Sequence, residues 1–185
     1  MVDILSPEQR SALMSKVQGS DTRPEWILRS ALHRLGFRFK LKNKHLPGRP
    51  DLVFPKYRTA VFVHGCFWHR HSGCKNASIP KTNHGFWRNK LDENVARDKR
   101  ASSALTKQGW RVLVVWECQL EGSTLKTIQK TVRAICGDSK CDWDIEAKQI
   151  SLRSTELLTL ADEKVRYRLR NQSQGKREIR HSGKG

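Results

Sequence analysis

The feature that most restricts the fold of this chain is a pair of short apolar runs with a long helical segment between them. Residues 59–63 form a continuous apolar run that predicts a strand buried on both faces, and residues 110–116 predict a second central strand. A helix is expected between them at about residues 86–108, with Gly109 as its stop. A strand, a helix and a strand in this order predict a parallel pair joined by a crossover.

Antiparallel strands are expected before this crossover. Phe37, Phe39 and Leu41 alternate with basic residues, which is typical of a half-buried strand, and residues 51–54 predict another strand after a turn. Together these elements predict an α/β fold with one central mixed sheet flanked by helices.

Two helices are expected near the N-terminus, each opened by a capping box. Ser6-Pro-Glu-Gln and Thr22-Arg-Pro-Glu both place a capping hydroxyl, a proline in the first turn and a Glu or Gln three positions on. Gly36 ends the second of these helices, and a last helix is expected at about residues 125–135. On the long helix, the residues spaced for one inward face are Leu91, Val95 and Leu105.

The charge balance indicates a polyanionic partner. The chain of 185 residues carries 36 Lys and Arg against 18 Asp and Glu, a formal net charge of +18. A basic surface without a partner is the plain alternative, but an excess this large is typical of nucleic-acid binding. A membrane partner is disfavoured because no apolar span of about 18 residues is present.

The length suits one core with a short appendage. We expect one domain over residues 1–153 and a basic, largely mobile tail over residues 154–185, serving either solubility or DNA binding. The N-terminus has neither the basic nor the long apolar region of a secretory signal, so we expect the protein in the cytoplasm or on the nucleoid.

Cysteine usage points to a metal. Without a secretory signal, disulfides are disfavoured, and thiolate–metal ligation becomes the leading explanation for clustered cysteines. Three thiolates and one imidazole satisfy a closed tetrahedral Zn²⁺ site, which would hold a loop rather than perform chemistry. His69 is an alternative ligand by its spacing, and thiols without a metal are the other alternative. Outside this cluster, Cys136 fits the apolar face of its helix, and Cys141 has no assigned role. The candidate ligands are Cys66, His71, Cys74 and Cys118.

Asp51 is the candidate for phosphodiester chemistry. It starts the strand at residues 51–54, where its carboxylate can project at a sheet edge. Mg²⁺ prefers such hard oxygen ligands, although an ordinary turn aspartate is the plain alternative. The neighbouring strand would bring a backbone carbonyl, His64 and His69 to the same edge, and a histidine can deprotonate water. Glu25 completes a capping box, a role that is compatible with orienting a water.

Aromatic residues surround the predicted metal loop. Phe67 and Trp68 flank candidate ligands, and Trp87 opens the long helix. Large aromatic side chains on a basic surface can wedge between base steps, and an unstable base pair makes the insertion easier. Core packing is the alternative, and we expect it for Trp110 and Trp116.

Three functions fit these features: an endonuclease, a zinc-stabilised DNA-binding protein without catalysis, and a base-excising glycosylase. The second leaves Asp51, His64 and His69 without a role. The third needs no Mg²⁺ ligand at a sheet edge and favours a base-sized pocket.

Several segments, taken in order, resemble the very-short-patch-repair (Vsr) endonucleases. The similarity runs from about Arg10 to Cys136. It implies a zinc-carrying variant of the restriction-endonuclease-like (PD-(D/E)XK) fold, and nicking of one strand 5′ of the thymine in T·G mismatches left by 5-methylcytosine deamination. The matching segments are Arg10-Ser-Ala-Leu-Met-Ser15, Thr22-x-Pro-Glu25, Leu46-Pro-Gly-Arg-Pro-Asp51, Val63-His-Gly-Cys-Phe-Trp-His69, Asn94-Val-Ala-Arg-Asp98 and Gly109-Trp-Arg-Val-Leu-Val-Val-Trp-Glu-Cys118.

The resemblance also implies roles for single residues. Asp51 and the backbone carbonyl of Val63 would bind Mg²⁺, and His69 would be the general base. Glu25 and His64 would organise the attacking water. The implied zinc ligands are Cys66, His71, Cys74 and Cys118, and the implied DNA contacts are Phe67, Trp68 and Trp87 by intercalation and Met14, Lys90 and Asn94 at the mismatch or its neighbours.

The usual second acid of the wider fold is absent from the predicted strands. Asp51 is therefore expected to act with no neighbouring carboxylate as a substitute metal ligand. The expected partner is duplex DNA with a T·G mismatch and, by analogy with the family, mismatch-repair proteins such as MutL. A monomer suffices to nick one strand.

Overall fold

The protein is described by a computed structural model that covers residues 20–41 and 43–137. The helix expected at Ser6, the DNA contact expected at Met14 and the boundary expected at 153/154 lie outside these residues, as does Cys141.

The described residues form one mixed four-stranded sheet, with the strands in the order β1-β2-β3-β4. The antiparallel part joins β1 (Lys40–Leu41) to β2 (Leu52–Phe54) and β2 to β3 (Thr59–His64). β3 pairs in parallel with β4 (Arg111–Trp116), and helix α3 (His84–Lys107) forms the crossover between them. This topology confirms the predicted mixed sheet and its crossover.

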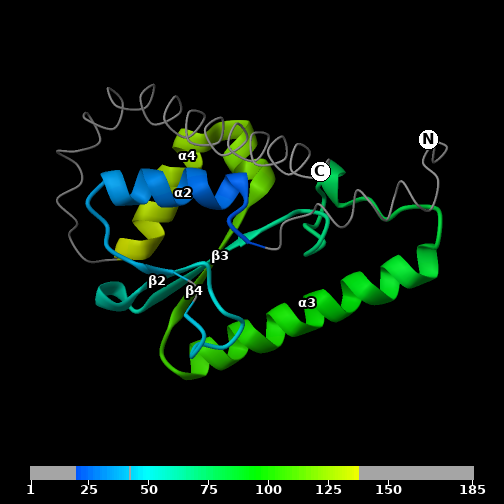
Figure 1. Cartoon of the computed structure of the whole chain (residues 1–185), viewed down its shortest axis with the longest axis horizontal. Coiled ribbons are helices and arrows are strands. Elements are labelled where there is room, and N and C mark those ends of the chain that lie inside the picture. The colour runs from blue at the N-terminus through cyan, green and yellow to red at the C-terminus, as the bar shows by residue number, and fades with distance from the viewer. Residues whose placement is uncertain (1–19, 42, 138–185) are drawn as a thin grey trace, which may run out of the picture.

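Helices cover both faces of the sheet (Figure 1). α2 (Arg23–Arg34) and α4 (Glu117–Cys136) lie on one side and α3 on the other. The main core lies between the sheet and the α2–α4 pair, whereas a smaller cluster of Ala60, Phe62 and Leu105 joins the sheet to α3. β3 is buried along almost its whole length, as its apolar run predicted, because both of its faces are covered.

Two strands differ from their prediction. β4 is the last strand in the described sheet rather than a central one, and Val114 is 37% exposed. The strand expected from Phe37 is shortened to Lys40–Leu41. Phe37 and Phe39 nevertheless point inward, with ring centroids 6.1 and 5.4 Å from that of Phe54. The predicted alternation is therefore confirmed for Phe37 and Phe39 and wrong for Leu41, which is 48% exposed, and most of the segment forms no ladder.

Helices α3 and α4 also differ in part from what the spacing of apolar residues predicted. α4 begins eight residues before the predicted 125, because a first helical segment precedes a kink at Ser123, where the backbone is non-helical. In α3, Leu91 and Leu105 are fully buried as expected, but Asn94 is buried and Val95 only half-buried. Two single-turn 3₁₀ helices, η1 (Pro55–Tyr57) and η2 (Lys75–Ala77), complete the elements.

Cys136 lies in the main core with 4% of its surface exposed, as predicted. It also takes part in a disulfide, which corrects the expectation that disulfides are disfavoured in this chain. Across the part of the chain that the structure describes, none of the helices has the length and apolarity needed to span a bilayer.

Candidate active site and metal centre

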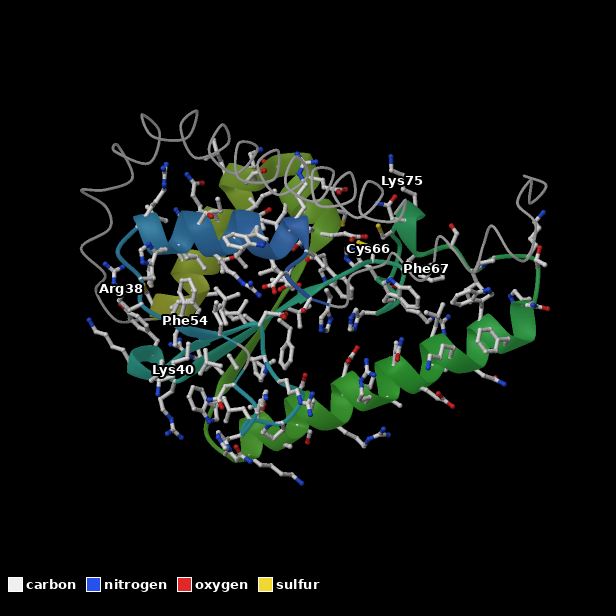
Figure 2. The ribbon with its side chains drawn as sticks, viewed as in Figure 1. Arg38, Lys40, Phe54, Cys66, Phe67 and Lys75 are labelled. Carbon is white, nitrogen blue, oxygen red and sulfur yellow. The ribbon has the colours of Figure 1, made fainter. Side chains whose placement is uncertain are left out.

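The cysteine–histidine cluster lies at the end of the two parallel strands. Cys66 follows β3, and Cys118 lies in the first turn of α4, directly after β4. The carboxyl ends of parallel neighbours meet at one sheet edge, so residues far apart in sequence become neighbours. Figure 2 shows Cys66 and Phe67 at this end of the sheet, away from Phe54. The four residues whose ligand atoms lie within 4.8 Å of one another are Cys66, His71, Cys74 and Cys118.

The donor set and its spacing suit a tetrahedral metal ion. His71 Nδ1 lies 3.3 Å from Cys118 Sγ and 3.5 Å from Cys66 Sγ. Two ligands on a tetrahedral Zn²⁺ are expected about 3.5 Å apart, from Zn–S and Zn–N bonds of about 2.3 and 2.0 Å. The cluster is therefore consistent with a zinc site, and it contains His71 rather than the alternative ligand His69.

The loop is shaped for these ligands by its own backbone. His71 N donates to Cys66 O at 3.0 Å, and Cys74 N donates to His71 O at 3.2 Å. Burial raises the pKa of the Cys66 thiol to about 12, and burial also raises the pKa of Cys118. A hydrogen bond from the Asn76 backbone lowers the pKa of Cys74. A bound cation is the usual means of holding such buried thiols as thiolates.

A cleft of about 1160 Å³ lies beside this centre and contains the predicted catalytic residues Glu25, Asp51, His64 and His69. Asp51 stands immediately before β2, and its Oδ2 accepts a hydrogen bond of 2.7 Å from Val63 N. The N–H and C=O of one strand residue point to the same side of the strand. The Val63 carbonyl is therefore on the side of β3 that faces Asp51.

The two cleft histidines lie face to face. The rings of His64 and His69 are stacked, with centroids 3.7 Å apart and an interplanar angle of 9°. Burial and then repulsion from His69 lower the pKa of His64 to about 4, so its imidazole is neutral near pH 7.

Asp98 is a site residue that sequence reasoning left without a role. Its Oδ2 lies 2.5 Å from His69 Nδ1, and it projects from α3 into the cleft. The only sequence signal was its place in the segment that begins at Asn94. An ionised carboxylate can only accept a hydrogen bond, so in the neutral form of the His69 imidazole the proton lies on Nδ1 and Nε2 carries the lone pair.

Glu25 is held by several donors. Its Oε1 accepts from the Thr22 backbone at 3.3 Å and from the Thr22 hydroxyl at 3.0 Å, which confirms the predicted capping arrangement. Its Oε2 accepts from Asp21 N at 3.2 Å and pairs with the Arg29 guanidinium. Glu25 is 4% exposed and Arg29 is 5% exposed, so this carboxylate is fixed in position.

Three further carboxylates share the cleft of Asp51, whose expected role as a metal ligand without a substitute carboxylate stays a prediction. Glu25, Asp98 and Glu117 line the same cleft as Asp51. They come from α2, α3 and α4, three elements that the sequence alone could not bring together.

The predicted DNA-contacting aromatics gather in one cluster. Ring centroids of Phe67, Trp68 and Trp87 lie 5.1 to 6.1 Å apart in edge-to-face contacts, and each ring is half-buried. Phe86 is 63% exposed beside Trp87, and sequence reasoning gave it no role. Trp116 is half-buried rather than a core residue, because its ring stacks on His71 at 4.1 Å.

The two DNA contacts predicted on α3 differ in their exposure to solvent. Lys90 is exposed, whereas Asn94 is 9% exposed and its Nδ2 donates to Trp68 O at 3.2 Å. Both line the cleft. Asn94 thus ties α3 to the aromatic cluster.

Cations line the cleft as well. Arg49 lies on the turn before Asp51, and Arg100 lies on α3; neither forms an ion pair with another described residue. Gly48 makes this approach possible, because a Cβ there would lie 2.6 Å from the Ala101 Cβ. The turn therefore packs directly on α3, and both arginines border the same cavity.

Comparisons with known proteins agree in the kind of protein they find. A family model described as DNA mismatch endonuclease Vsr matches residues 2–76. The type II nicking enzyme V.XorIIP of Xanthomonas oryzae pv. oryzae is 49% identical over 139 residues, which cover 75% of this chain and 100% of the relative. The DNA mismatch endonuclease Vsr of Escherichia coli K12 is 41% identical, over 75% of this chain and 90% of the relative. The type II nicking enzyme V.NmeAIP of Neisseria meningitidis serogroup A is 41% identical, over 73% and 97%.

Proposed function

Because the chain belongs to the Vsr DNA mismatch endonuclease family and is a DNA nicking endonuclease, we propose that it cuts one strand 5′ of the thymine in a T·G mismatch, with Mg²⁺ as cofactor. Such mismatches arise when 5-methylcytosine deaminates, and the nick would start very-short-patch repair. The observation that carries this proposal is the meeting of Asp51 and the His69–Asp98 pair in one cleft. The sheet and its flanking helices support a variant of the PD-(D/E)XK fold.

The hard oxygen donors of the cleft suit Mg²⁺. The Asp51 carboxylate and the Val63 carbonyl would hold the ion, and the bond from Val63 N to Asp51 supports their proximity. When bound, Mg²⁺ supplies charge stabilisation for the attacking and leaving oxygens of the phosphodiester.

His69 would act as the general base. Asp98 accepts the Nδ1 proton, which leaves Nε2 to take a proton from the attacking water. The stacked, neutral His64 restricts the His69 ring to one plane. Glu25, held by Thr22 and Arg29, would orient the water through its remaining acceptor capacity.

The zinc centre would have a structural role. Cys66, His71, Cys74 and Cys118 provide four protein ligands, which leaves no position for a reacting water. Holding the loop would fix both His69 and the aromatic pair that flanks it.

DNA would bind along the cleft that Arg49 and Arg100 border, with the aromatic cluster entering the duplex at the weak pair. Phe67, Trp68 and Trp87 form one contiguous cluster, as a wedge requires. Lys90, Asn94 and, from outside the described residues, Met14 would contact the mismatch or its neighbours. The exposure of Lys90 favours such contact. Asn94 would have to contact DNA while its Nδ2 stays bonded to the Trp68 carbonyl.

We place this activity in the bacterial cytoplasm, on the nucleoid, in a protein that acts as a monomer. The nuclease domain would span residues 1–153 and the basic tail residues 154–185. Contacts with mismatch-repair proteins such as MutL are proposed by analogy with the family.

A strand-resolved nicking assay tests the proposal. Duplexes that differ only in one pair (T·G, T·A, C·G and the remaining mismatches) are end-labelled on either strand and incubated with Mg²⁺. We expect cleavage of the thymine strand alone, 5′ of the mismatched base. Equal cutting of matched and mismatched duplexes would contradict mismatch specificity, and release of a free base would indicate a glycosylase.

A further inference from the structure

The Gly65–Cys66 peptide lies where the loop with the cysteine–histidine cluster meets the cleft. Both its carbonyl oxygen and its N–H form hydrogen bonds. The carbonyl oxygen of Gly65 accepts a hydrogen bond of 3.2 Å from His69 N. The N–H of the same peptide, that of Cys66, donates to Glu117 Oε1 at 3.0 Å. This peptide therefore connects the Glu117 carboxylate to the backbone of His69.

The fold brings Glu117 to this point. His64 pairs with Trp116 in the parallel ladder, so the next residues, Gly65 and Glu117, leave their strands side by side. A Cβ at Gly65 would lie 3.5 Å from Glu117 Oε2, which shows how closely the carboxylate approaches the turn. Glu117 also lines the cleft.

We propose that Glu117 is a positioning residue of the nuclease site, acting through the Gly65–Cys66 peptide. Asp98 fixes the ring of His69, and Glu117 fixes the backbone from which that ring projects. This inference rests on the proposed function, because it assigns Glu117 to the reaction of His69.

The physical basis is the strength of a charged acceptor on a buried donor. Cys66 is fully buried, so its N–H would lose a partner that water does not replace if the carboxylate were removed. A carboxylate acceptor makes a stronger hydrogen bond than a neutral one and polarises the peptide, which strengthens the bond at its carbonyl end. Displacement of a catalytic group by about 1 Å can lower a rate by about 100-fold.

The test compares Glu117→Ala, Glu117→Gln and the matched control Glu121→Ala, an exposed carboxylate one turn further along α4. Single-turnover nicking of a T·G duplex gives the rate of chemistry, and titration of the DNA gives its affinity. Zinc content and the hydrogen exchange of the Cys66 amide are measured on the same preparations.

We expect Glu117→Ala to lower the rate by about 10- to 100-fold, with zinc content and DNA affinity retained and the Cys66 amide deprotected. Glu117→Gln keeps an acceptor for that amide and is expected to restore most of the rate and the protection. A Gln variant as slow as the Ala variant, with its amide still protected, would overturn the proposal in favour of a directly ligating carboxylate. An Ala variant with an unchanged rate would also overturn it. If the wild-type protein nicked no duplex, the proposed function would fail, while amide exchange would still decide whether Glu117 holds this peptide.

Discussion

The Nδ1 atom of His69 lies 2.5 Å from the Oδ2 atom of Asp98. His69 comes from the loop that carries the cysteine–histidine cluster, and Asp98 comes from the crossover helix α3, so they belong to separate elements of the fold. This contact defines the tautomer of His69 and directs its second nitrogen away from Asp98, which is the arrangement that a general base requires.

Asp98→Asn is expected to lower the nicking rate by about 100-fold or more, because an amide can stabilise the wrong tautomer of His69. DNA affinity should change little. Asp92→Asn is the matched control, since Asp92 lies on the same helix but pairs with Arg70 at the surface. Single-turnover kinetics give both values, and an Asp98→Asn rate within about threefold of the wild type would contradict this role.

Alanine variants of the two loop histidines, His69 and His71, should differ in how much zinc the protein retains. His71→Ala is expected to lose most of its zinc and to unfold at a lower temperature, because it removes a ligand. His69→Ala is expected to keep its zinc and lose nicking. Metal analysis and thermal unfolding of both variants check this, and full zinc content in the His71 variant would exclude it as a ligand.

Trp68→Ala is expected to reduce the preference for T·G over T·A by about tenfold, because aromatic stacking on a base contributes about 1–3 kcal/mol. The ratio of nicking rates on the two duplexes measures this preference. An unchanged ratio would refute the wedge. Trp110→Ala is the matched control, because Trp110 packs beside Arg58 rather than in the aromatic cluster.

Arg100→Ala is expected to weaken DNA binding similarly on all sequences. The slope of log affinity against log salt should fall by about 0.9 for the lost phosphate contact. Lys99→Ala removes the neighbouring exposed charge, which does not line the cleft, and should change the slope less. Equal slopes for Arg100→Ala and the wild type would remove Arg100 from the DNA-binding surface.

Local features of the fold were predictable because they rest on short-range chemistry. The Thr22 capping box, the buried run of β3 and the crossover helix all follow from neighbouring residues. The cysteine–histidine cluster was also predictable, since its residue types have few other uses in such a loop.

The rest depended on contacts between distant elements. Asp98 and Glu117 are ordinary helix acids in sequence, and only tertiary packing brings them to the cleft. Asn94 is buried where a polar residue would be expected at the surface, because it bonds to the Trp68 carbonyl. The apolar sequence of β4 did not reveal that β4 is the last strand of the described sheet. Its apolar residues are needed there because α4 covers one face of the strand.

The role of Asp51 is tested most directly by Asp51→Asn, which preserves the size of the side chain and removes its charge. Single-turnover nicking of a T·G duplex is measured across a Mg²⁺ titration, together with DNA affinity and zinc content. We expect the rate to fall by at least about 1000-fold at every Mg²⁺ concentration, because metal stabilisation of the reacting phosphate is worth several kcal/mol, with DNA affinity and zinc retained. Near wild-type nicking with the same Mg²⁺ dependence would show that this carboxylate does not hold the catalytic ion.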